Sequence, residues 1–187
     1  FELSVSSDNI EALVELLLAN GVATPAGLGA RDSLRLEAGL SLYGHDLDDT
    51  TSPIEAGLNW VIPKKRREEG GFIGDDVILD HLKNGISRIR VGFTMSGPSA
   101  REGAKIFTAD GSEEVGVVTS GTISPILKKA VGMGYLKFGH HTDGTELQVD
   151  VRGKLRPLTV GKPPFVPTNY KIKPKKKKTL KKKKSAQ

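Results

Sequence analysis

The chain has 187 residues, enough for one large domain or two small ones, and its 37% hydrophobic and 27% charged residues are typical of a protein with a packed core. It contains no cysteine, which excludes disulfides, thiol catalysis and cysteine-based metal sites, and no apolar run approaches the roughly 20 residues of a membrane-spanning helix. The formal charge of +6 comes from residues 171–187, which hold ten lysines and no acid; residues 1–170 have 18 basic and 22 acidic residues, a net charge of −4.

The first 84 residues predict a region of mixed helices and strands. Residues 1–5, FELSV, alternate apolar and polar side chains as a strand does, and residues 9–20 form a helical pattern that Gly21 stops. A loop then leads to a second amphipathic helix over residues 29–44. The pattern continues with a helical turn starting at Ser52 and Pro53, a strand at 59–62, a basic loop at 63–71 and a helix at 74–82.

After Gly85 the pattern changes to short strands separated by glycine-containing turns. The strand-like stretches are residues 86–95, 104–109, 113–121, 130–138 and 146–155. Strands at this spacing predict a small antiparallel barrel or sandwich. The boundary between the α+β region and this all-β domain is therefore expected near Asn84.

The helix at 29–44 carries charged residues through an apolar segment. Arg31 and Arg35 lie one turn apart on the same face, with Asp32 and Glu37 nearby. The expected buried surface of this helix comes from four leucines: Leu34, Leu36, Leu40 and Leu42. An arginine beside an apolar helix suits a planar anion, because its guanidinium can bind a carboxylate through two hydrogen bonds. The alternative is a surface ion pair, which is common and contributes little to stability.

No spacing typical of a metal or nucleophile site is found. The four histidines, His45, His81, His140 and His141, show neither helical i, i+4 spacing nor a carboxylate partner pattern, and are interpreted as exposed loop residues. The glycine-rich stretches lack the strand–loop–helix context of phosphate sites. No Ser–His–Asp arrangement is predicted either.

Several long blocks together resemble one family. GLGARDSLRLEAGLSLYG, SPIEAGLNWVI, KKRREEGGFIG, VTSGTISPILKKAVGMGYL and PFVPTNY occur in order between residues 1 and 170. They are similar to the T-protein (aminomethyltransferase) family of the glycine cleavage system. The resemblance implies an α+β fold: residues 1–84 as the C-terminal part of a ferredoxin-like folate-binding region, and residues 85–170 as a small antiparallel β-barrel. Residues 171–187 lie outside the resemblance and are expected to form a disordered lysine-rich tail.

The resemblance also implies an activity and partners. Family members transfer a one-carbon unit from the aminomethyl-lipoyl arm of the H protein to tetrahydrofolate, with release of ammonia, in the mitochondrial matrix. No metal is expected. The family's catalytic aspartate would lie upstream of Phe1, so the chain is expected to be a C-terminal fragment that is inactive alone, with no catalytic residue of its own.

Three positions match folate- or substrate-binding residues of the family. Glu2 corresponds to a glutamate that contacts the pterin ring, and a carboxylate can accept two hydrogen bonds from an aminopyrimidine edge. Arg31 corresponds to the arginine of the ARDSLRLEAGL block, and Tyr170 to a C-terminal tyrosine that closes over the same site. Without the resemblance, Glu2 and Tyr170 would be interpreted as ordinary surface residues.

Two alternatives stay open at this point. Sarcosine and dimethylglycine dehydrogenases carry a related folate-binding region behind a flavin domain. The chain could instead be a non-catalytic protein whose lysine-rich tail binds nucleic acid or anionic lipid through counterion release. The tail has no aromatic residues for base stacking, and a solvated tail without a specific partner is the simpler interpretation.

Overall fold

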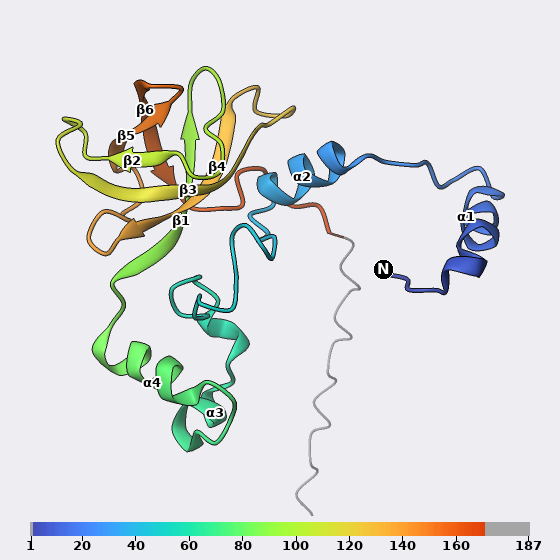
Figure 1. The fold of residues 1–187 in the computed structure, drawn as a ribbon, viewed down its shortest axis with the longest axis horizontal. Coiled ribbons are helices and arrows are strands. Elements are labelled where there is room, and N and C mark those ends of the chain that lie inside the picture. Colours follow the sequence, from blue (N-terminus) through green and yellow to red (C-terminus); the bar gives the residue numbers. More distant parts are fainter. Residues whose placement is uncertain (1, 171–187) are drawn as a thin grey trace, which may run out of the picture.

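The computed structural model describes residues 2–170, so the predicted disordered tail lies outside the described part of the chain. A closed six-stranded antiparallel barrel forms the body, and the helices lie outside it (Figure 1). The α+β class with a C-terminal barrel is confirmed. Before Arg88, however, the described residues contain helices, turns and a single bridge between Tyr43 and Leu47, so the strands of a ferredoxin-like region are not formed there.

The barrel closes through neighbours that are distant in sequence. Its strands are β1 (Arg88–Met95), β2 (Lys105–Phe107), β3 (Glu114–Ile123), β4 (Ala130–Lys137), β5 (Glu146–Val151) and β6 (Lys154–Gly161), in the order β1-β4-β3-β2-β5-β6, and β6 pairs back with β1. The stretch expected as one strand at 146–155 is instead a hairpin. It turns at Arg152 and Gly153, which both have positive φ as tight hairpin turns require.

Strand β4 explains how a helix docks on the barrel. Its first seven residues are all buried, because one face points into the barrel and the other is covered from outside. Val131 and Met133 pack on the outer side against Leu36 and Phe165, in a cluster separate from the barrel core. The barrel core itself contains Val91, Phe93, Ile106, Val115, Val118, Leu136, Val149 and Leu158, among others.

Helix α2 (Leu28–Glu37) is shorter than the sequence predicts. It ends because Gly39 takes a positive φ of 72° and the Leu40 N–H donates to the Arg35 carbonyl, 2.8 Å away, which closes the C-terminus. Leu40 therefore follows the helix and is exposed, and Leu34 is exposed as well. Of the four leucines expected to be buried, Leu36 alone is fully so.

The N-terminal segment is set apart from the barrel (Figure 1). It contains a 3-10 turn, η1 (Ser7–Asn9), and helix α1 (Ile10–Leu18), which confirms the predicted helix. The predicted strand at 1–5 is wrong for residues 2–5, which are exposed and irregular; Phe1 lies outside the described residues. An alternating pattern forms a strand only where a neighbouring strand pairs with it, and within residues 2–170 no strand does so.

Two further expectations between residues 58 and 71 are wrong. The predicted strand around Trp60 is a 3-10 turn, η2 (Asn59–Val61), and the tryptophan is exposed. The predicted basic loop is helix α3 (Lys64–Glu69), in which two lysine–glutamate pairs at i, i+4 span 3.7 Å each. The helix predicted at 74–82 is confirmed as α4 (Asp75–Asn84).

Candidate functional site

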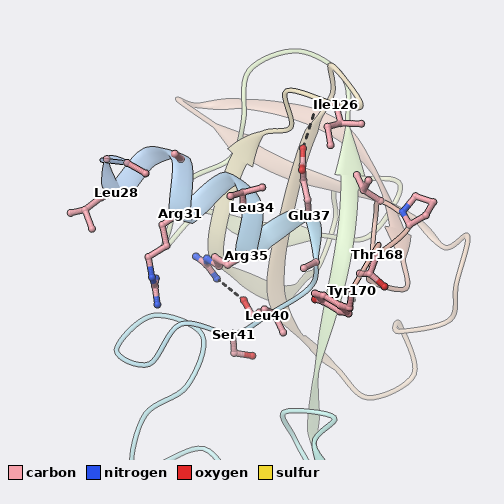
Figure 2. A pocket seen from close by; sticks show the side chains of 16 residues that line it. Leu28, Arg31, Leu34, Arg35, Glu37, Leu40, Ser41, Ile126, Thr168 and Tyr170 are labelled. Carbon is pink, nitrogen blue, oxygen red and sulfur yellow. Dashed lines mark hydrogen bonds between the residues drawn. The ribbon is translucent and has the colours of Figure 1, made fainter. Parts of the chain in front are cut away.

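A hollow with mostly apolar walls lies along helix α2, and we call it the α2 pocket. It has a volume of about 840 Å³ (Figure 2). Its walls are α2 itself, residues 38–41, the hairpin residue Ile126, and the C-terminal segment 166–170. Apolar side chains dominate: Leu28, Leu34, Leu40, Ile126, Val166 and Pro167. A hollow of this size with few polar groups is typical of a small-molecule site.

The C-terminal segment reaches α2 by close backbone contacts. The Phe165 N–H donates to the Glu37 carbonyl at 2.8 Å. Gly39 lies so near Pro163 that a Cβ at this position would collide with the proline ring. The positive φ of Gly39 and this contact both require glycine, so the LEAGL block of the sequence directly shapes one end of the pocket.

Arg31 is exposed and lines the α2 pocket. No ion pair within residues 2–170 involves it, because the neighbouring Asp32 pairs with Arg35 instead, at 2.7 Å. The alternative of a surface ion pair therefore does not apply to Arg31 in the described structure. Its guanidinium is available to an anion at one end of an apolar hollow.

Arg35, predicted on the same helix face as Arg31, is buried in the structure. It is only 8% exposed, and its guanidinium bonds to Asp32, to Asp46 and, at 2.9 Å, to the Ser120 hydroxyl on β3. The helix turn that separates the two arginines is enough to bring Arg35 against the barrel, while Arg31 stays in solvent. Arg35 is therefore a buried link between α2 and β3.

Asp46 completes this link from the loop after α2. It is 1% exposed and accepts hydrogen bonds from the Leu42 N–H at 2.9 Å and the Thr119 hydroxyl at 2.5 Å, in addition to Arg35. Its backbone carbonyl accepts a bond from the Tyr135 hydroxyl at 2.9 Å. A buried carboxylate with this many donors is fully satisfied. In the sequence Asp46 stands in the acidic stretch HDLDDTTSP, and no local pattern distinguishes it from the exposed Asp48 and Asp49.

The structure brings two of the three predicted binding residues together. Arg31 and Tyr170 both line the α2 pocket, at different parts of its wall (Figure 2). Tyr170 is 64% exposed. Glu2 is exposed in the N-terminal segment and does not line this pocket.

Among the polar residues of the pocket, sequence reasoning did not assign Glu37 or Ser41 to a site. Glu37 is a buried carboxylate, 5% exposed, at the end of α2. Ser41 lines the pocket with a buried hydroxyl that has no hydrogen-bond partner among the described residues. An acid inside an apolar block was a usable signal for Glu37; the serine gave none.

Arg31 also borders a second, more polar hollow of about 490 Å³. It is lined in addition by Arg101 and by the pair His45–Glu102, whose atoms approach to 2.6 Å.

Among the histidines, only His45 is exposed as expected; His81 belongs to α4, and His140 and His141 are half-buried after β4. Within residues 2–170, no cluster of three or more potential metal ligands occurs, and no helix is both long and apolar enough to cross a bilayer.

A second charged cluster joins α4 and β1 to the turn at residues 52–56. Glu55 accepts a bond from Arg88 at 2.8 Å and from the Ser52 N–H at 3.0 Å, and the Ser52 hydroxyl lies 2.8 Å from His81 Nδ1. Burial raises the pKa of Glu55, but the bonds from Arg88 and Ser52 outweigh it, so the pKa is lowered. Burial also raises the pKa of Tyr135 to about 12. None of these residues lines the α2 pocket.

Comparison with known proteins agrees with this architecture. Residues 88–167 match the model of the glycine cleavage T-protein C-terminal barrel domain, and residues 1–66 match that of the GCVT N-terminal domain. The chain is 53% identical over 178 residues to a protein of Dictyostelium discoideum named aminomethyltransferase, mitochondrial, which covers 91% of this chain and 44% of that protein. The protein of the same name from Saccharomyces cerevisiae is 49% identical, again with 91% and 44% covered.

A solved structure leads to the same family. The glycine cleavage system aminomethyltransferase T from Bartonella henselae superposes with a TM-score of 0.78 and 43% sequence identity, over 83% of this chain and 43% of that one. The chain belongs to the glycine cleavage T-protein family. It spans less than half the length of these relatives.

Proposed function

We propose that this chain forms part of a tetrahydrofolate-dependent aminomethyltransferase of the glycine cleavage system. The enzyme would take the aminomethyl group from the lipoyl arm of the H protein, pass its one-carbon unit to tetrahydrofolate to give 5,10-methylenetetrahydrofolate, and release ammonia. The contribution of the protein would be mainly to orient the folate amine against the aminomethyl carbon, an effect worth about 7 kcal/mol or more when alignment is good.

The observation that carries this proposal is the placement of Arg31. It has no carboxylate partner within residues 2–170, and it borders an apolar pocket that Tyr170 also lines. A folate combines flat rings with carboxylates, so apolar walls next to a guanidinium match its chemistry. Arg31 would bind the anionic part of the ligand, and Tyr170 would cover it.

Glu2 is proposed as the acceptor for the aminopyrimidine edge of the pterin. This proposal rests on the family resemblance alone, because Glu2 is exposed and lies outside the α2 pocket. For Glu2 to contact a ligand in the α2 pocket, the N-terminal segment would have to approach that ligand from outside the pocket walls.

The remaining proposals concern the protein as a whole. The lipoylated H protein is the expected partner, and the mitochondrial matrix the expected location, since the relatives above are named mitochondrial. Residues 1–187 alone are expected to show no one-carbon transfer, because the resemblance places the catalytic aspartate outside them. No observation favours the flavin-linked dehydrogenases.

Calorimetry of the full-length protein with tetrahydrofolate tests the proposal. We expect saturable binding that Arg31→Gln and Tyr170→Ala weaken. Lys154→Gln, on the exposed β5–β6 hairpin, is the control and should leave binding unchanged. Absence of any affinity for tetrahydrofolate in the full-length protein would overturn the proposal.

A further inference from the structure

Glu37 is an acid in an unusual environment. It is 5% exposed, and within residues 2–170 no lysine, arginine or histidine nitrogen approaches its carboxylate within the 4 Å of an ion pair. Buried carboxylates are normally paired with a cation, because burial of an unpaired carboxylate is energetically unfavourable. A buried carboxylate without a cation therefore indicates a structural or functional role for its hydrogen bonds. The contacts of Glu37 indicate which parts of the structure it holds in place.

Its side chain holds the hairpin between β3 and β4. One carboxylate oxygen, Oε1, accepts a bond from the Ser124 hydroxyl at 2.5 Å and a longer one from the Ile126 N–H at 3.4 Å. Ser124 is completely buried, and its hydroxyl in turn accepts a bond from the Leu127 N–H at 2.9 Å. The carboxylate thus accepts two hydrogen bonds from the tip of this hairpin, and one of the two donors, the Ser124 hydroxyl, is itself the acceptor of a third bond within the tip.

Its backbone holds the C-terminal segment. The Glu37 carbonyl accepts bonds from the Phe165 N–H at 2.8 Å and the Val166 N–H at 3.4 Å. Val166 begins the stretch that ends at Tyr170 and forms one wall of the α2 pocket. A single residue of α2 therefore contacts both of the other elements that surround the pocket.

Hydrophobic packing does not explain the position of Ile126. Its side chain is 62% exposed, so little apolar burial holds it at the pocket wall. Figure 2 shows the Glu37 carboxylate directed at the Ile126 backbone, with the isoleucine side chain above the pocket. Two backbone bonds of 2.8 Å, from the Lys128 N–H to the Ser124 carbonyl and from the Ser124 N–H to the Lys129 carbonyl, close the turn that carries Ile126. The bonds of Ser124 and Ile126 to the Glu37 carboxylate join this turn to α2.

We propose that Glu37 is a positioning residue for the α2 pocket, which sets Ile126 as an apolar, specificity-determining wall opposite Arg31. The identity of the ligand rests on the proposed function above. The role of Glu37 in the placement of Ile126 does not depend on it. Glu37 acts through Ile126 and does not itself need to touch the ligand.

The test uses Glu37→Leu, which removes the acceptor but keeps similar bulk, and Glu37→Gln, which keeps an acceptor oxygen. Methyl chemical shifts and amide hydrogen exchange are measured on residues 1–187 without ligand. In Glu37→Leu we expect at least tenfold faster exchange at Ile126 and Leu127 and shifted methyl signals of Ile126 and Leu34. The barrel-core methyls of Val149 and Leu158 should not move. Glu37→Gln should restore most of the wild-type behaviour.

Affinity for 5-formyltetrahydrofolate, measured on the full-length protein, provides the second readout. We expect Glu37→Leu and Ile126→Ala to weaken binding by a similar factor, about fivefold to twentyfold, and the double variant to lose no more than either alone. If Glu37→Leu does not fold, Ser124→Ala is used in its place, because it removes the donor of the same hydrogen bond.

The outcomes separate the two proposals. Unchanged Ile126 exchange and methyl shifts in a folded Glu37→Leu protein, or multiplicative losses in the double variant, would overturn the positioning role. A wild-type protein that binds no folate would overturn the proposed function, while the exchange measurement would still decide whether Glu37 sets the pocket wall.

Discussion

Arg31 and Arg35 stand four positions apart on one helix, and the structure gives them opposite surroundings. Arg31 remains in solvent without an ion pair within residues 2–170, whereas Arg35 is 8% exposed and bonded to two carboxylates. Spacing along the helix could not separate them. The difference arises from the direction in which α2 docks on β3 and β4, which depends on residues far away in sequence.

The first prediction concerns Arg31. Arg31→Lys keeps the positive charge but loses the two-pronged hydrogen bonding of the guanidinium, so the full-length protein should lose at least tenfold in one-carbon transfer. Because Arg31 makes no ion pair within residues 2–170, the melting temperature should change by less than about 2 °C. Activity is measured with tetrahydrofolate and aminomethylated H protein, with thermal melting in parallel. Unchanged activity would show that Arg31 is an ordinary surface residue.

The second prediction concerns the buried pair of Arg35 and Asp46. Removal of Asp46 would leave Arg35 with Asp32 as its one carboxylate partner and would take an acceptor from the Leu42 N–H and the Thr119 hydroxyl. Loss of one partner of a buried charge pair costs about 3–5 kcal/mol. Asp46→Ala should therefore lower the free energy of unfolding by about this amount, and Arg35→Lys by less, since a lysine can keep one of the contacts. Urea unfolding of residues 1–187 measures both, with Asp49→Ala, at an exposed position of the same loop, as the control. A loss below about 1 kcal/mol for Asp46→Ala would contradict the structural role.

At the scale of secondary-structure elements, local sequence patterns were sufficient to predict several helices and strands. Helices α1 and α4 and most of the barrel strands follow from periodicity and from glycine turns. The prediction failed where a tertiary contact decides the outcome: α2 stops at Glu37 because Gly39 must accommodate Pro163, and FELSV has no strand to pair with in the described structure. Contacts of this kind carry no local signal.

The candidate site likewise contains residues that could be predicted from the sequence and residues that could not. The residues Arg31 and Tyr170 came from the family resemblance, and the structure places both at one pocket. Glu37 and Ile126 were not predicted, because a wall made of a helix end, a hairpin and a terminal segment exists only after the barrel closes. Leu34 and Leu40 were expected in the core, yet they line the pocket instead.

The contact between the turn at residues 52–56 and β1 predicts a dependence of stability on acid. The pKa of Glu55 is lower in the folded protein than in the unfolded chain, so the stabilisation is present above the unfolded value, about 4.3, and is lost as pH falls through the folded value. Glu55→Gln should therefore be less stable than wild type at pH 7, and the difference should shrink below about pH 4. Urea unfolding at pH 7, 5 and 3.5 measures this. An unfolding difference that is constant with pH would contradict the ion pair with Arg88.

At the scale of the whole molecule, charge is divided unequally along the chain. Residues 1–170 carry a net charge of −4, whereas residues 171–187 carry ten lysines and no acid. The sequence pI of about 9.5 thus says little about the surface of the barrel and its helices. A polyanion should respond to the two parts in opposite ways, because phosphate and sulfate groups attract lysines and repel an acidic body.

The last prediction follows from this division. Retention of residues 1–187 on heparin or on duplex DNA should depend on residues 171–187 and should fall steeply with salt, since each neutralised phosphate releases about 0.9 counterion. A variant that ends at Tyr170 should pass through at low salt, because its net charge is −4. Replacement of the ten lysines by glutamine is the matched control, since it keeps the length of the segment and removes only its charge. If the shortened chain is still retained, the polyanion contact belongs to the folded part, and the basic helix α3 with its Lys64 and Lys65 would be the first place to look.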